Sequence, residues 1–180
     1  MLSIVTWLEK IQINYIYEKI IKEEKNMGFD INGLNPNKEP THTQYDKEEP
    51  VGKYFRNNVW WWRKMWGMVG SIGEYVYRDQ QGIPQDTRDS EMNQHNREEL
   101  VEWRKMWQNG TYNDGQKYEG KWLTLVEDTL QYAIDNKDSK DITDFLKFLD
   151  KEIGSDYQFN WKNVEEFHEF VVNSGGFEIW

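Results

Sequence analysis

The sequence contains no cysteine among its 180 residues. Disulfides, thiolate nucleophiles and cysteine-ligated zinc or iron–sulfur sites are therefore excluded. The absence of cysteine also fits a reducing compartment, and we expect a cytoplasmic protein.

Basic charge and long apolar runs are also scarce. The 22 Lys and Arg residues are outnumbered by 32 Asp and Glu residues, which gives a formal net charge of -10. This balance argues against broad nucleic-acid binding, because Lys and Arg are needed to replace the counterions of a phosphate backbone. It suits either a basic protein partner or simple solubility. No run approaches the ~20 apolar residues of a transmembrane helix, so no membrane span is predicted.

Aromatic residues are plentiful. They make up 16% of the chain, and ten of them are tryptophan, so much of the core must consist of large rings. Apolar spacing predicts helices over 54–78, 90–108, 121–136, 141–153 and 161–173, and short strands within 27–40 and 177–180. The two strands could pair beneath the helices. The predicted fold class is α+β, mostly α-helical, with the helices packed on a small sheet from short terminal strands.

Residues 27–180 are predicted to form a single globular domain, and residues 1–26 differ from it in composition. The first 26 residues are rich in Ile, Lys, Asn and Tyr and contain no Gly or Pro. As a helix they would be amphipathic and suited to docking or membrane-surface contact. Alternatively, Lys22–Asn26 can be encoded by a purine-rich run that resembles a ribosome-binding site. On that hypothesis Met27 is the natural start and residues 1–26 are an upstream extension.

The stretch YFRNNVWWWRKMWGMV, residues 54–69, holds four tryptophans in seven positions. Helical spacing places Trp61, Trp62 and Trp66 on one broad apolar face, which predicts their burial. Trp60 falls on the polar side with Arg63 and Lys64. It could form a cation–π pair with these cations or offer a stacking platform to a planar ligand.

The pentapeptide WRKMW recurs at 103–107. Its flanks diverge, so we expect two helices that use the same packing solution rather than a repeat protein. Gly67, Gly70 and Gly73 are spaced three apart within the predicted helix. Small residues at this spacing predict the close approach of a second helix.

The motifs of common enzyme classes are absent. The chain has no Walker A loop and no G-x-S-x-G elbow. Glu165 and His168 have the spacing of half a di-iron site, but no second Glu-x-x-His accompanies them, which favours a solvated helix face. The sequence therefore predicts no metal and no cofactor, and it leans against an enzyme.

Four stretches together carry a resemblance to a family. They read MGFDINGLNP at 27–36, YFRNNVWWWR at 54–63, YNDG at 112–115 and NVEEFHEFVVNSGGFEIW at 163–180. This set resembles an uncharacterised family of small bacterial and phage proteins. Members open with Met-Gly-x-Asp-x-x-Gly-x-Asn-Pro and end in Ser-Gly-Gly-Phe-Glu-Ile. In this chain Lys64-Met65 follows Trp-Trp-Trp-Arg, where members of the family have Pro-Leu. The resemblance supports Met27 as the start and implies no activity. It makes a phage or mobile-element accessory role in a bacterial host cell, such as defence evasion, the expected context.

The leading hypothesis is a non-enzymatic binding protein for a nucleotide-like small ligand. Tryptophan would supply a flat apolar face, and Arg and Asn would supply directional hydrogen bonds. The alternatives are an acidic protein that inhibits a basic host factor, and an enzyme of unknown reaction. The predicted ligand-binding residues are Arg56, Asn57, Asn58, Trp60 and Arg63, with Asn113 and Asp114 on a loop that closes over them.

Overall fold

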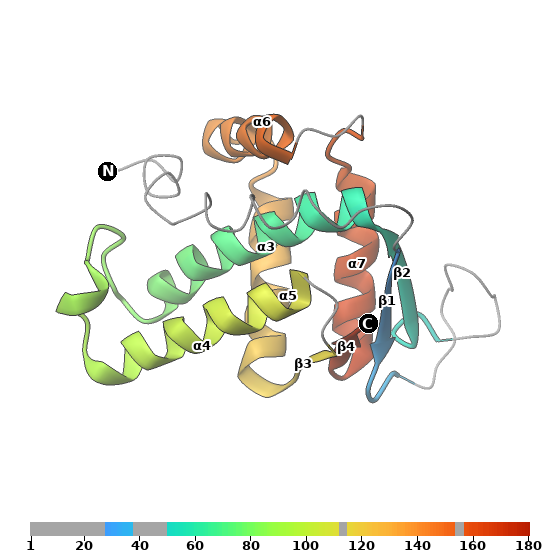
Figure 1. Cartoon of the computed structure of the whole chain (residues 1–180), viewed down its shortest axis with the longest axis horizontal. Coiled ribbons are helices and arrows are strands. Elements are labelled where there is room, and N and C mark those ends of the chain that lie inside the picture. The colour runs from blue at the N-terminus through green and yellow to red at the C-terminus, as the bar shows by residue number, and fades with distance from the viewer. Residues whose placement is uncertain (1–27, 38–49, 112–114, 154–156) are drawn as a thin grey trace.

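The computed structural model describes residues 28–37, 50–111, 115–153 and 157–180. Both hypotheses for residues 1–26 concern a segment outside the described residues, so they stay predictions. The described chain is mostly helical with a small antiparallel sheet, which confirms the predicted fold class (Figure 1). Its elements are β1 (Gly28–Gly33), β2 (Tyr54–Asn58), α3 (Val59–Gln80), η1 (Asp89–Glu91), α4 (Gln94–Thr111), β3 (Gln116–Tyr118), α5 (Gly120–Asp135), α6 (Lys140–Ile153), α7 (Trp161–Ser174) and β4 (Phe177–Ile179).

The sheet has the strand order β2-β1-β4-β3, and every neighbouring pair is antiparallel. Ile31 of β1 pairs with Ile179 of β4, so the predicted pairing of the two terminal strands is confirmed. Alternate residues of the strands are buried, including Phe29, Phe55 and Phe177. The described helices lie on one side of the sheet (Figure 1). The buried rings of Phe55 and Phe177 contact Phe167 and Phe170 of α7.

The predicted helix over 54–78 is wrong at its start, because its first five residues form β2. Phe55 is buried and Arg56 is exposed, as expected for the alternation of a strand. The helix begins only after Asn58, whose side chain accepts a hydrogen bond from the Trp61 backbone N–H at 2.9 Å. Asn is a preferred N-cap residue. The tryptophans that follow have helical spacing, and this spacing gave no indication that residues 54–58 form a strand.

Helix α3 is buried on nearly all sides, and this contradicts the polar side predicted for it. Lys64 is only 1% exposed and Ser71 is buried. The Lys64 ammonium donates to the Asp150 carboxylate of α6 at 2.6 Å and to the carbonyl oxygen of Tyr157. A helix with neighbours all around it must pair its cations internally rather than expose them to water.

The tryptophans of α3 are not all buried. Trp62 and Trp66 have no exposed surface and stack with their ring centroids 4.8 Å apart. Trp61 is partly exposed and packs edge-on against Tyr157, so its predicted burial is wrong. One side of the first turn of α3 therefore reaches the surface.

The two WRKMW copies pack against each other across α3 and α4. The Trp66 indole donates to the carbonyl oxygen of Trp107 at 3.0 Å, and the Trp107 indole donates to that of Trp66 at 2.7 Å. The first tryptophan of each copy does the same, since Trp62 donates to Gly110 and Trp103 donates to Gly70. The two copies therefore pack in the same way, as expected, and they do so against each other.

Two of the three spaced glycines permit this contact. A Cβ at Gly70 would lie 2.1 Å from the ring of Trp107, and one at Gly73 would lie 2.4 Å from the ring of Trp103. At Gly67 the nearest atom, in Leu149, is at an ordinary 3.6 Å. The prediction of close helix approach is confirmed at Gly70 and Gly73 and is wrong at Gly67.

Two of the stretches that carry the family resemblance, 27–36 and 163–180, contact each other through backbone hydrogen bonds. The Leu34 backbone N–H donates to the Gly176 carbonyl at 2.8 Å, and that of Asn35 donates to the Ser174 carbonyl at 2.9 Å. Gly175 has a φ of +58°, and a Cβ there would lie 2.3 Å from the Asn35 carbonyl oxygen. Gly175 therefore allows the two backbones to approach each other this closely.

Candidate functional site

The face of the sheet turned away from the helices is polar and partly exposed. On β1 and β2 the side chains that alternate with the buried ones point to this side. The same alternation turns Trp180 outward after the buried Ile179, and this residue is 53% exposed. We call this surface the outer face; it consists of Asp30, Asn32, Tyr54, Arg56, Lys117, Glu178 and Trp180.

Three of these side chains stand in a row on neighbouring strands. Arg56 lies opposite Asp30 in the β1–β2 register, with its Nε 3.8 Å from the Asp30 Oδ1. Asp30 and Trp180 exchange backbone hydrogen bonds of 2.9 and 2.8 Å, so they are also directly opposite each other. The row brings a guanidinium, a carboxylate and an indole together on one surface.

Asp30 is held by its neighbours through a single oxygen. The Tyr54 hydroxyl donates to Asp30 Oδ1, the same oxygen that faces Arg56. Asp30 Oδ2 accepts no hydrogen bond from the described part of the chain. The carboxylate, whose side chain is 44% exposed, therefore keeps an acceptor for a further donor.

The Arg56 side chain passes close to Gly28 of β1. A Cβ at Gly28 would lie 3.3 Å from Arg56 Nε and 3.5 Å from one of its terminal nitrogens. The first of these contacts is tighter than most, so the exposed Arg56 side chain would have to give by a few tenths of an ångström.

The predicted ligand-binding run 56–58 does not converge on one place. Arg56 points to the outer face, whereas Asn57 points to the helices and is only 3% exposed. The buried Asn57 Nδ2 has no hydrogen-bond partner in the described structure. Asn58 serves as the N-cap of α3. Strand alternation separates these three side chains, although they are neighbours in sequence.

Trp60 and Arg63 form the predicted cation–π pair. The Arg63 guanidinium carbon lies 5.6 Å from the centroid of the Trp60 ring. Trp60 is partly buried and packs against the core. Its ring already contacts the core and a cation, so it offers a ligand less free surface than Trp180 does.

Asn113 and Asp114, the predicted closing loop, lie outside the described residues. The adjacent Gly115 is described, and a Cβ there would lie 3.4 Å from the Trp180 ring. The chain therefore enters β3 beside the indole at the end of the Arg56–Asp30–Trp180 row.

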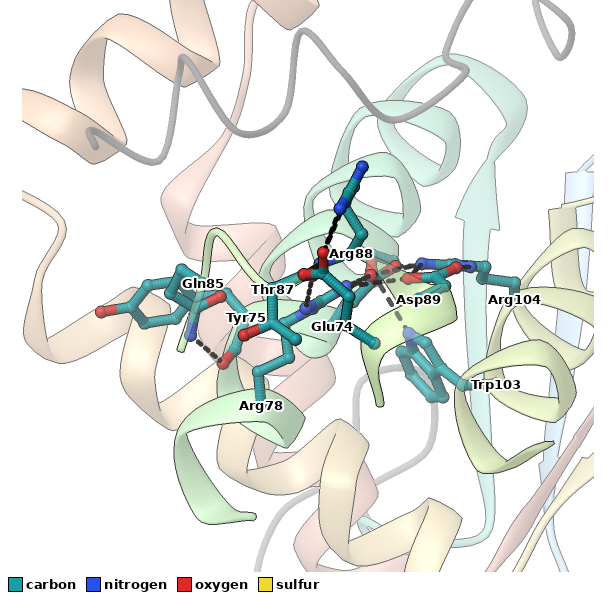
Figure 2. Close-up of polar contacts among 11 residues, drawn as sticks. Glu74, Tyr75, Arg78, Gln85, Thr87, Arg88, Asp89, Trp103 and Arg104 are labelled. Carbon is teal, nitrogen blue, oxygen red and sulfur yellow. Dashed lines mark hydrogen bonds and ion pairs between the residues drawn. The ribbon is translucent and has the colours of Figure 1, made fainter. Parts of the chain in front are cut away.

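A second polar cluster lies at the other end of α3, and none of its residues was among the predicted site residues. Glu74 and Arg78 of α3 are both buried, and Arg78 Nη2 lies 3.1 Å from the Glu74 Oε1 and from the Asp89 Oδ1 (Figure 2). Arg104 of α4 approaches from the opposite side and donates to both carboxylates. The one feature of the sequence that could have indicated this cluster is the i,i+4 spacing of Glu74 and Arg78, which suits an ion pair on a helix.

The charges of this cluster balance within the molecule. Hydrogen bonding from Arg104, together with the charges of Arg104 and Arg78, holds the pKa of Asp89 below its ordinary value despite partial burial. Burial by itself would lower the pKa of Arg104, but its bonds to Glu74 and Asp89 raise it. Arg78 also donates to the Thr87 carbonyl at 2.9 Å. The cluster thus fastens α4 and the chain around η1 to α3, which is a structural role.

Comparison with known proteins gave no match to any family model, to any curated protein or to any solved structure. Among the residues that the structure describes, no three His, Asp or Glu side chains gather closely enough to hold a metal ion. None of the described helices combines the length and the apolar character needed to cross a membrane.

Proposed function

We propose that this protein is a non-enzymatic binding protein whose outer face takes a planar, nucleotide-like small ligand. The observation that carries the proposal is the row of Arg56, Asp30 and Trp180 on one exposed surface. An indole supplies a flat stacking surface, while the ion pair beside it supplies hydrogen-bond donors and an acceptor.

The charge balance of the outer face limits which part of a nucleotide-like ligand it can recognise. Arg56 and Lys117 are matched by Asp30 and Glu178, and both pairs lie within 4 Å. A balanced surface gives a phosphate little net attraction. Recognition would therefore depend on the ring and its polar edge, and phosphate groups would add little affinity.

The test is isothermal titration calorimetry with a panel of nucleosides and nucleoside monophosphates. Replacing Trp180 by Ala should weaken binding by about 1–3 kcal/mol, the usual contribution of an aromatic ring that stacks on a base. Arg56→Ala should weaken it as well. Arg97→Ala removes an exposed arginine of α4, outside the sheet, and should leave the affinity unchanged.

Two results would contradict this proposal. One is the absence of binding to every member of the panel. The other is binding that survives both Trp180→Ala and Arg56→Ala, since the ligand would then occupy another part of the molecule. If only a Trp60→Ala variant lost ligand binding, the ligand would bind at the first turn of α3.

The second candidate function is an acidic protein that inhibits a basic host factor. The exposed side of α7 supports it, since Glu165 and Glu169 are exposed there and Val172 is 46% exposed close by. An exposed apolar residue beside carboxylates suits a basic partner that also makes an apolar contact. A phage or mobile-element accessory role in the cytoplasm of a bacterial cell would fit this function.

A pull-down at low and high salt separates the two candidates. An inhibitor should capture a basic protein at low salt, release it at high salt, and lose it in a Glu165→Lys, Glu169→Lys variant. The Arg56→Ala variant is the matched control and should still capture that protein. Capture that depends on Arg56 would instead favour the outer face.

A further inference from the structure

We propose that the base recognised by the outer face is guanine; this inference rests on the proposed function. It follows from the order of the polar groups along the Arg56–Asp30–Trp180 row. A carboxylate next to a guanidinium presents an acceptor and then a donor to the edge of a bound ring.

Asp30 supplies the acceptor. Its Oδ1 already accepts from the Tyr54 hydroxyl and faces Arg56, which fixes the orientation of the carboxylate. Its Oδ2 accepts nothing from the described residues. Guanine places two donors, the ring N1–H and the exocyclic amino group, side by side on one edge. A carboxylate is the side chain that suits such an edge, because it accepts only.

Arg56 supplies the donor. Guanine carries its O6 next to the N1–H, and an arginine reads the O6 and N7 of guanine with two parallel hydrogen bonds. The Arg56 side chain lies across β1 over Gly28, with its Nε 3.8 Å from Asp30. The guanidinium and the carboxylate therefore sit side by side, as the O6 and N1–H of guanine do.

Adenine has the wrong order of groups for this pair. Where guanine has O6 and N1–H, adenine has an amino donor and an unprotonated ring nitrogen. Its amino group would face the Arg56 guanidinium, and its N1 would face the Asp30 carboxylate. Both contacts are repulsive, so the row should discriminate against adenine and not merely favour guanine.

Trp180 completes the site as the stacking surface. Its backbone is paired with Asp30, so the indole stands one strand away from the carboxylate on the same side of the sheet. Its ring lies beside Gly115, where a Cβ would be in ordinary van der Waals contact with it, 3.4 Å away. Stacking does not distinguish one base from another, so the selectivity resides in Asp30 and Arg56.

The experiment measures the dissociation constants of guanosine, adenosine and cytidine for the full chain by titration calorimetry. Guanosine should bind about tenfold or more tightly than adenosine, as expected for one well-placed pair of hydrogen bonds to a base edge. Cytidine presents the same order of groups as adenosine, an amino donor beside an unprotonated ring nitrogen, so it should bind as weakly as adenosine does.

The Asp30→Asn variant tests the acceptor directly. An amide both donates and accepts, so this variant should lose the guanosine preference while it keeps the stacking surface. Glu178→Gln, which changes the other carboxylate of the outer face, should keep the preference. Because both positions lie on the outer face and only a carboxylate oxygen is replaced, circular dichroism should show both variants folded.

The possible outcomes separate this inference from the proposed function. Equal affinity for guanosine and adenosine, or a guanosine preference that survives Asp30→Asn, overturns the guanine assignment alone. Failure of every nucleoside to bind overturns the proposed function and the guanine assignment together. A guanosine preference that Asp30→Asn abolishes and Glu178→Gln keeps supports both.

Discussion

At the scale of single residues, Gly70 and Gly67 form a matched pair on α3. A Cβ at Gly70 would lie 2.1 Å from the Trp107 ring, whereas one at Gly67 would meet only Leu149 at 3.6 Å. We expect Gly70→Ala to destabilise the protein by about 1–3 kcal/mol, since the indole must move or the helices must separate. Gly67→Ala should instead stabilise it by about 0.5–1 kcal/mol through helix propensity.

Urea unfolding followed by circular dichroism measures both effects. The comparison isolates the helix contact, because the two variants make the same chemical change on the same helix. Equal stabilities for the two variants would mean that Trp107 does not pack on Gly70 as described.

Asp89 gives a second prediction at this scale, for stability at low pH. Its folded pKa lies below the ordinary value because Arg104 and Arg78 hold its carboxylate. An unfolded Asp has a pKa of about 3.9, so the stabilisation is complete above that pH and is lost as the pH falls toward the lower folded value. Asp89→Asn should reduce stability at neutral pH and flatten its decline below about pH 4.

The measurement for Asp89 is the urea midpoint across that pH range. A variant whose stability falls with acid as steeply as that of the wild type would show that other carboxylates dominate the acid response.

At the scale of elements, the helices could be predicted from the sequence better than the strands. Helices α5, α6 and α7 begin and end within a residue or so of their predicted bounds, because their apolar stripes follow the helical period without interruption. Strand β1 was predicted from its alternation. Strand β3 lies between the predicted helices at 90–108 and 121–136, and its three residues are too few to show the alternation of a strand.

Strand β2 was missed for a different reason. Its Tyr54 and Phe55 suit a strand, but the tryptophans that follow at helical spacing extended the helical pattern through Asn58. The error also affected the site, since a helix would have gathered Arg56, Trp60 and Arg63 on one side. The pairing of Arg56 with Asp30 depends on the register between two strands, which the sequence of neither strand contains.

The position of β4 in the sheet leads to a prediction about this element. It lies between β1 and β3, and its Phe177 and Ile179 have no exposed surface. A chain that ends at Gly176 should lose the joint between β1 and β3 and expose the apolar side of the remaining strands. We expect loss of cooperative unfolding and increased binding of a hydrophobic dye. Trp180→Ala, which removes only a half-exposed ring, should unfold cooperatively.

At the scale of the whole molecule, the family resemblance supports Met27 as the start, and β1 begins at the next residue, Gly28. If Met27 is the natural start, a protein that begins there should keep the sheet and helices α3 to α7. Its circular dichroism spectrum and its urea midpoint should match those of the full chain. A marked loss of stability would show that residues 1–26 pack on the domain and would argue against Met27 as the natural start.

The strand order also has a consequence for the kinetics of folding. Strand β1 comes first among the described elements and its partner β4 comes last, so the centre of the sheet forms only when distant parts of the chain meet. Contacts of such long sequence separation slow folding. Until β4 arrives, one edge of β1 has no partner within the described fold, and such an edge can pair with another chain. We therefore expect partly folded chains, rather than the native protein, to be the species most prone to aggregate.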